Sequence, residues 1–162
     1  MSDVTVSVLP PVGMITIRGG FDTLRGPVAQ VTGLDLPSRR MAVWGEGRGL
    51  LWMSPDELML TCDYDDAPAI SDALQSAFGP GFATAAVVSD ARQAFDLKGE
   101  GAQVILSKLA PVDFAALAPS EVRRTRLAQV PAALWRQDDG WRLVCFRSVA
   151  VYVEGLLRNA AA

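Results

Sequence analysis

One sequence pattern occurs twice in this chain, and that repeat limits the folds open to it. The repeated residues are Leu51, Trp52, Leu60 and Cys62 in the first copy and Leu134, Trp135, Leu143 and Cys145 at the same spacing in the second. An apolar segment ending in a basic residue and glycine precedes each copy, at 15–19 and 95–99. Internal similarity on this scale is typical of one supersecondary unit used twice. We therefore expect two similar halves, each burying its apolar face against the other.

The period of the apolar residues predicts the same order of elements in both halves: strand, helix, strands, helix. In the first half, strands are expected at 12–18, 41–44, 50–53, 58–62 and 83–88, and helices at 24–32 and 68–78. In the second half, strands are expected at 93–97, 125–130, 132–136 and 141–146, and helices at 102–109 and 149–158. Asp22 or Thr23, Asp65 or Asp66, and Ser148 are expected to cap three of these helices. Pro131 predicts a bulge or an edge strand.

Mostly antiparallel strands with helices on one face define an α+β protein. The element order predicts two ferredoxin-like (split βαβ) pseudo-repeats, at about 10–88 and 89–160. The connection at 88–92 is too short to be a linker, so we expect the repeats to pack as one body, a single domain over 1–162.

Composition excludes several kinds of function. The chain has 162 residues, half of them hydrophobic and a fifth charged, which fits one globular domain. A net charge of −3 disfavours nucleic-acid binding. There is no histidine, which excludes an imidazole base and histidine metal ligands. The basic residues are 13 Arg and two Lys, an excess that fits either contact surfaces or a GC-rich genome.

Location and thiol state follow from simple sequence features. No apolar run approaches the ~18 residues that would span a membrane. The first residues show no signal-peptide pattern. Two cysteines in a chain of this size indicate a reducing compartment, so a cytoplasmic protein is expected. Cys62 and Cys145 hold equivalent strand positions among apolar neighbours, which favours buried, inert thiols over a disulfide or a redox pair.

The candidate interface residues are one tryptophan and a cluster of arginines. Arg124 and Arg126 would share one face of a strand beside Arg123, a geometry suited to binding a carboxylate or to a solvated strand edge. Trp44 ends a predicted strand and is the best aromatic candidate for an interface. Trp52 and Trp135 occupy matching repeat positions, so we expect both to fill the core.

Glycine motifs and paired acids are weaker candidates. Gly45-x-Gly47-x-Gly49 fits a hairpin turn better than a phosphate loop, because it does not open a helix. Gly99-Glu100-Gly101 does precede a helix, so an anion there is conceivable. Asp56-Glu57 and Asp138-Asp139 lie in predicted turns, where acids usually face water.

Several stretches, taken in order, carry a resemblance to a known family. They are 52–60, 88–90, 95–99, 106–113, 124–130, 134–135 and 147–152, which read WMSPDELML, VSD, FDLKG, LSKLAPVD, RTRLAQV, LW and RSVAVY. This set resembles the gamma subunit of heterotetrameric sarcosine oxidase. The resemblance covers roughly residues 45–158, and only the ordered set is specific.

This resemblance implies a fold similar to the folate-binding aminomethyltransferase fold of the glycine-cleavage T-protein. It also implies a bacterial complex in which the alpha subunit carries NAD and the tetrahydrofolate site, the beta subunit carries FAD and FMN, and the delta subunit holds zinc. The gamma chain has no assigned catalytic residue, so we expect no catalytic, cofactor-binding or metal residue here. Asp90 lies in a matching stretch and is either a structural turn residue or a pterin contact.

The sequence thus predicts a non-catalytic gamma subunit of a complex that demethylates sarcosine oxidatively to glycine, with alpha, beta and delta partners and chiefly alpha. The alternative is a stand-alone folate- or pterin-binding protein. A third possibility, autonomous aminomethyl transfer, lacks identifiable catalytic residues.

Overall fold

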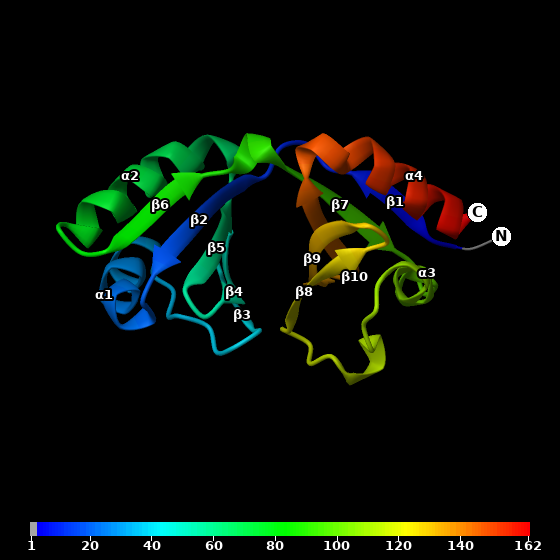
Figure 1. Cartoon of the computed structure of the whole chain (residues 1–162), viewed down its shortest axis with the longest axis horizontal. Coiled ribbons are helices and arrows are strands. Elements are labelled where there is room, and N and C mark those ends of the chain that lie inside the picture. Colours follow the sequence, from blue (N-terminus) through cyan, green and yellow to red (C-terminus); the bar gives the residue numbers. More distant parts are fainter. Residues whose placement is uncertain (1–2) are drawn as a thin grey trace. The chain divides into compact units, whose positions relative to one another are not determined.

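A computed structural model describes residues 3–162 (Figure 1). The chain forms two compact units. The first unit is formed by residues 12–89, and the second by the segment that ends at Pro11 together with residues 90–162. Each unit has a five-stranded sheet whose neighbouring strands are all antiparallel. The predicted mixture of helices with antiparallel sheets is confirmed.

The first unit contains β2 (Gly13–Gly19), α1 (Phe21–Thr32), β3 (Ala42–Gly45), β4 (Arg48–Ser54), β5 (Glu57–Cys62), α2 (Ala67–Phe78) and β6 (Ala83–Val87). Across the sheet the strands are ordered β3-β4-β5-β2-β6. Alternate residues of β2 and β5, such as Ile15 and Leu60, are buried in one apolar cluster with Leu24 of α1 and Leu74 of α2. The two helices therefore cover the same face of the sheet.

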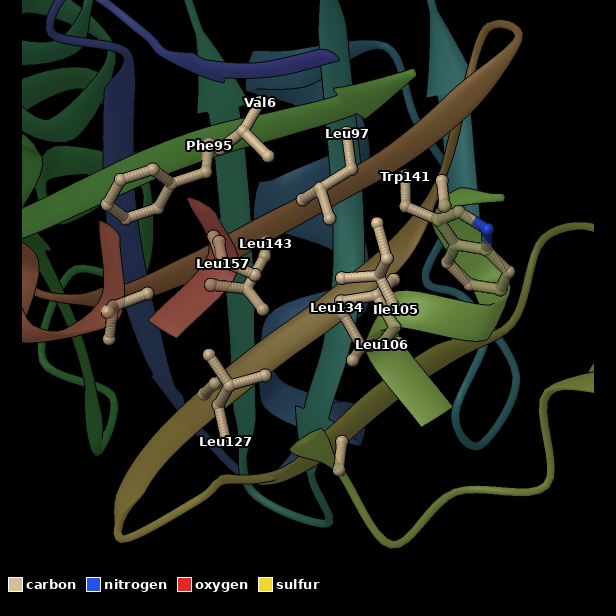
Figure 2. Close-up of a cluster of buried hydrophobic side chains, with 14 of the residues drawn as sticks. Val6, Phe95, Leu97, Ile105, Leu106, Leu127, Leu134, Trp141, Leu143 and Leu157 are labelled. Carbon is tan, nitrogen blue, oxygen red and sulfur yellow. The ribbon is translucent and has the colours of Figure 1, made fainter. Parts of the chain in front are cut away.

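The second unit contains β1 (Thr5–Val8), β7 (Arg92–Lys98), α3 (Ala102–Leu109), β8 (Val122–Leu127), β9 (Val130–Gln137), β10 (Gly140–Phe146) and α4 (Ala150–Ala161). Its sheet has the order β1-β7-β10-β9-β8. Figure 2 shows its apolar cluster, in which side chains from the strands, among them Phe95, Leu97 and Leu143, lie with Ile105 of α3 and Leu157 of α4. Helices cover one face of this sheet as well.

The N-terminal strand β1 was absent from the sequence prediction. It belongs to the second unit, where it pairs antiparallel with β7, from Thr5 opposite Lys98 to Val8 opposite Phe95. Short strands of four residues give little periodic signal. The pairing partner of β1 lies about ninety residues further along the chain, and nothing local in the sequence indicates it.

The predicted ends of α1 were right at one end only. The helix ends at Thr32, as predicted, and Gly33 follows it in the left-handed conformation with φ 73°. The helix begins at Phe21 after Gly20, however, so neither Asp22 nor Thr23 caps it. Similarly, Asp66 precedes α2 without a capping side-chain hydrogen bond, and Ser148 lies in a 3₁₀ turn before α4. None of these three helices begins with the side-chain cap that the sequence predicted.

The hairpin between β8 and β9 differs from the prediction. Its two-residue turn is Ala128-Gln129, because Leu127 pairs with Val130, and Ala128 has φ 50°. A turn without Gly, Asn or Asp carries little sequence signal. Pro131 lies inside β9, which is not an edge strand, and the register shows no bulge there, so that prediction was wrong.

The repeated tryptophans lie on opposite faces of their sheets. Trp52 pairs with Leu58, whose side chain faces the helices, whereas Trp135 pairs with Arg142 on the face away from them. A bulge between Trp52 and Ser54 adds one residue to β4. Because side chains alternate between faces, one extra residue reverses them. Trp135 is fully buried but Trp52 only partly, so the prediction that both fill the core was wrong for Trp52.

Candidate functional site

The predicted interface residues lie on one edge strand of each sheet, β3 in the first unit and β8 in the second. Trp44 on β3 is opposite Gly49 of β4, and Arg124 on β8 is opposite Ala133 of β9. The repeats align through Leu60 and Leu143, and in that alignment Trp44 and Arg124 coincide. Both β3 and β8 are edge strands of their sheets. The same position of the fold therefore presents an aromatic ring in one unit and a guanidinium in the other.

Trp44 is packed against a glycine. A Cβ atom on Gly49 would overlap the six-membered ring of Trp44, and it would come within 2.8 Å of the Thr61 hydroxyl. The ring therefore covers Gly49 on the sheet face away from α1 and α2, and it remains 41 % exposed. Trp44 also interacts with other residues of the chain. Its ring has both a structural contact and an exposed surface.

The three arginines of β8 point in two directions. Arg123 faces the helix side, opposite Leu134, and its Nη2 donates to Glu121 Oε1 at 2.8 Å. Its Nε is buried without a hydrogen-bond partner in the described part of the chain. Arg124 and Arg126 are exposed on the opposite face, as their alternation on a strand predicted. Arg123 is therefore a structural residue, whereas Arg126 presents its charge to solvent.

Three of the four acids from the predicted turns pair with side chains that lie beside them in the structure, and Glu57 is buried at the start of β5 and does not face water as expected. Asp56 accepts a hydrogen bond from the Ser54 hydroxyl at 2.7 Å, and Glu57 pairs with Arg18 at 3.1 Å. Asp139 pairs with Lys98 at 3.0 Å, and this hydrogen bond lowers the pKa of Asp139. Asp138 takes a positive φ of 51° in the turn. These acids therefore do not form the shared pair that general acid–base catalysis needs.

Asp90 has a structural role through its backbone. It lies in the 3₁₀ turn Ser89–Ala91 at the start of the second unit, and its carbonyl accepts a hydrogen bond from Arg147 Nε at 2.8 Å. Arg147 also donates to the carbonyl of Arg92 at 2.8 Å. A turn role at this position agrees with the first of its two predicted interpretations, and a pterin contact is an untested prediction.

Neither glycine motif forms a phosphate-binding loop. Gly45 pairs with Arg48 across a two-residue turn, so the first motif is the predicted hairpin. In the second motif, the backbone N–H of Gly101, which precedes α3, donates to the Asp3 carboxylate at 3.4 Å. The anion at this helix N-terminus is therefore supplied by the chain itself.

The two thiols are buried and protonated at neutral pH. Burial raises the pKa of Cys145 to about 11, although Arg147 and Arg92 act in the opposite direction. Burial also raises the pKa of Cys62, which Arg48 partly opposes. Both cysteines are free, as predicted. A thiol must ionise to act as a nucleophile or metal ligand, so neither is suited to that chemistry.

An open pocket of about 310 Å³ lies in the second unit, between the β9–β10 turn and the start of α3. Glu100, Asp138 and Asp139 are among its lining residues, as is Trp141, whose ring the Arg136 guanidinium covers at 4.5 Å. Within residues 3–162, no three His, Cys, Asp or Glu side chains gather closely enough to hold a metal ion. None of the described helices has the length and apolar character needed to cross a bilayer.

These observations define a class of protein by its fold: an α+β chain built of two similar units, with interface candidates on its sheet edges. The same fold occurs in the glycine cleavage system aminomethyltransferase T from Bartonella henselae, with a TM-score of 0.68 and 15 % identity over 96 % of this chain and 45 % of that one. The chain belongs to the sarcosine oxidase gamma subunit family, whose model matches residues 21–162.

Individual relatives agree with this assignment. Sarcosine oxidase subunit gamma of Corynebacterium sp. (strain U-96) is 33 % identical over 86 % of this chain and 68 % of its own length. The counterpart from Arthrobacter sp. is 28 % identical over 79 % of this chain and 63 % of its own length. This chain thus spans about two thirds of the length of these relatives.

A solved structure of a complex contains a similar chain. A chain of the heterotetrameric sarcosine oxidase from Corynebacterium sp. U-96, in complex with pyrrole 2-carboxylate, matches with a TM-score of 0.86 and 27 % identity. The match covers 98 % of this chain and 83 % of that chain. Family, fold and this structure therefore agree with the resemblance seen in the sequence.

Proposed function

We propose that this chain is a non-catalytic gamma subunit of a heterotetrameric sarcosine oxidase, in which it packs chiefly beside the alpha subunit. The observation that carries the proposal is the family match over residues 21–162. The similarity to a chain of the Corynebacterium heterotetramer over 98 % of this chain supports it. The reaction of the whole complex is the oxidative demethylation of sarcosine to glycine. FAD, FMN, NAD, tetrahydrofolate and zinc lie in the other subunits, and the complex is cytoplasmic.

Each unit is proposed to be a ferredoxin-like repeat with one added edge strand. The support is the strand order, because β5 lies between β2 and β4. These are the strands before and after α1 when the added strand β3 is set aside, as in a split βαβ unit. In the second unit, β10 lies in the same way between β7 and β9. On this interpretation β3 and β8 are the added strands, and they carry Trp44 and the arginines.

The two repeats are further proposed to fold as one body. The support is the path of the chain, which passes from one unit to the other twice, at residues 11–12 and 89–90. Two short connections restrict independent unfolding more than a single linker does. The matched core variants described in the Discussion test this proposal.

Trp44, Arg123, Arg124 and Arg126 are proposed to lie at or beside the interface with the partner. Exposed aromatic and arginine side chains contribute much of the binding energy in interfaces. Arg123 would act indirectly, through its ion pair with Glu121. Arg126 is the most informative member of the set, because it is exposed and its substitution should leave the fold intact.

Co-expression tests the subunit role. The tagged chain is produced with the alpha, beta and delta subunits of the same organism, and the purified material is analysed by gel filtration and flavin absorbance. We expect one complex of four different chains that oxidises sarcosine. Purification of a lone chain that binds tetrahydrofolate in calorimetry would instead support the alternative, a stand-alone folate-binding protein.

A charge reversal tests the interface. Arg126→Glu should weaken assembly about 10-fold or more at low salt, with a smaller effect at high salt, because charges across an interface steer association. Arg25→Glu, at an exposed position of α1 in the first unit, is the matched control. Equal assembly of both variants would exclude Arg126 from the interface while leaving the subunit role intact.

A further inference from the structure

Two strands from different parts of the chain fill the same place in the two units. In the first unit, β6 pairs antiparallel with β2 at the end of the sheet and follows α2 in the chain. In the second unit, β1 pairs antiparallel with β7, which is the counterpart of β2. Yet β1 precedes the whole first unit in sequence (Figure 1). The second unit thus receives from a distant segment the strand that the first unit makes locally.

The middle of this segment is held by backbone pairing and by one buried side chain. Val6 is 8 % exposed and lies opposite Leu97, and Figure 2 shows it beside Phe95 and Leu97. The Val6 carbonyl also accepts a hydrogen bond from Nη1 of Arg158 in α4 at 3.4 Å. A helix residue and the strand edge therefore both recognise the segment.

The two ends of the segment meet specific features of the second unit. At the C-terminal end, the Leu9 N–H donates to the Ala94 carbonyl at 3.0 Å, and Gln93 Nε2 donates to the Leu9 carbonyl at 2.9 Å. At the other end, Asp3 accepts a hydrogen bond from the N–H of Gly101 at 3.4 Å. Together these contacts define a site about seven residues long.

Gly99 makes room for the segment. Its φ is 115°, and a Cβ at this position would come within 2.5 Å of the Asp3 carbonyl oxygen. Its counterpart Gly19 also has a positive φ, 154°, but there the close contacts are with Phe82 and Leu24. The second unit is therefore shaped to accept the backbone at Asp3.

The connection from this segment to the first unit begins with Pro10-Pro11. Proline has no backbone N–H, so these two residues cannot donate to a strand ladder. The division between the units falls immediately after Pro11. The contacts that hold residues 3–9 in place thus lie on one side of the proline pair, within the second unit.

We propose that the edge of β7 opposite β10, with Gln93 at one end and Gly99 and Gly101 at the other, is a strand-binding site. Its ligand is the N-terminal segment 3–9 of this chain, bound as a separable element. The site selects an extended segment with a carboxylate at its first position and an apolar side chain three residues later, as in Asp3 and Val6. Main-chain pairing supplies affinity and the alternate side chains supply selectivity, as in other strand-addition sites.

The test begins with the full chain already folded. A protease recognition sequence is inserted between Pro10 and Pro11, the protein is purified, and the insertion is cleaved. We expect the N-terminal peptide to stay bound through gel filtration and then to exchange with a fluorescent peptide of residues 1–10. Circular dichroism and tryptophan emission of the cleaved protein should match those of the uncleaved one.

Three control peptides make the test selective. A Val6→Asp peptide should bind about 100-fold more weakly, because a carboxylate would enter the apolar cluster. An Asp3→Asn peptide should bind about 2- to 5-fold more weakly at low salt, because it loses the charge at the α3 N-terminus. A peptide of residues 81–88, which contains β6, should not compete.

Three results would overturn the proposal. Loss of the peptide from a cleaved protein that stays folded would show that β7 holds no strand site. Unfolding on cleavage would show that the segment is not separable. Equal binding of the wild-type and Val6→Asp peptides would show that any strand can add to this edge.

Discussion

The two units share one architecture, yet they differ in charge and in the chemistry of their sheets. The first unit has five basic and nine acidic residues, a net charge of −4, whereas the second has ten basic and nine acidic residues, a net charge of +1. On the face away from the helices, the first unit pairs Thr16 with Met59. The equivalent residues in the second unit, Asp96 and Arg142, form a two-pronged ion pair at 2.8 and 2.9 Å. The fold therefore constrains the helix-covered face more strictly than the opposite face.

The comparison also shows how a sequence repeat can mislead. The tryptophan–leucine–cysteine spacing is identical in both copies. Because of the bulge after Trp52, the structural equivalent of Trp52 in the second unit is Arg136, and the equivalent of Leu51 is Trp135. Identical spacing therefore marks equivalent strands but not equivalent faces.

The largest expected effect comes from matched cavities in the two cores. Leu60→Ala and Leu143→Ala each remove a fully buried side chain at equivalent positions, and each should lower the free energy of unfolding by about 3 kcal/mol. If the repeats fold as one body, thermal unfolding of both variants shows one transition, shifted by similar amounts. Two transitions, of which each variant shifts only its own, would contradict the proposed single body.

The Asp96–Arg142 ion pair of the second unit can be replaced by the Thr–Met pair that the first unit has at the same place, Thr16 and Met59. Arg142→Met or Asp96→Thr alone should lower the free energy of unfolding by about 2 kcal/mol, because each leaves one charge largely buried without its partner. The remaining side chain is Asp96, 13 % exposed, in the first variant and Arg142, 20 % exposed, in the second. The double variant should recover to within about 1 kcal/mol of the wild type, since it recreates the Thr16–Met59 pairing. Denaturant titration of all three variants measures this. Additive losses in the double variant would mean that the two faces are not interchangeable.

A smaller effect is expected at the sheet edge of the first unit. Gly49→Ala should displace the Trp44 ring and lower the free energy of unfolding by about 1 kcal/mol. Tryptophan emission should change as the ring becomes more exposed. Ala133→Gly is the matched change in the second unit, where the opposite residue is Arg124. It should lower the free energy of unfolding by about 1 to 2 kcal/mol, through backbone entropy and the loss of a buried methyl group, and leave the emission unchanged.

The last prediction concerns the thiols, which should affect stability only at alkaline pH. The pKa of Cys145 is raised from 9.0 to about 11 in the folded protein, so the folded chain keeps a proton that the unfolded chain loses. Stability should therefore be unaffected below pH 9 and fall between pH 9 and about 11. Cys145→Ala should remove part of this slope when unfolding is followed against pH. An unchanged slope would assign the alkaline loss to other groups.

Much of the fold was predictable because its signals are local. The alternating residues of β2 and the turn acids Asp138-Asp139 placed strands and a hairpin correctly. The turn at Ala128-Gln129 was missed because neither residue favours turns, and Ala128 adopts its positive φ within the paired β8–β9 hairpin. Of the interface candidates, Arg124 and Arg126 were correctly placed on one strand face. The equivalence of Arg124 to Trp44 became visible only in the strand register.

The sequence by itself determined the element order and the α+β class, because hydrophobic period, glycine stops and hairpin turns act over a few residues. Only the tertiary structure decided the place of β1, whose partner β7 lies far along the chain. It also decided the faces on which Trp52 and Trp135 lie. The physical reason is common to both: strand pairing joins distant backbone groups, and a shift of one residue in that pairing exchanges the two faces of a sheet.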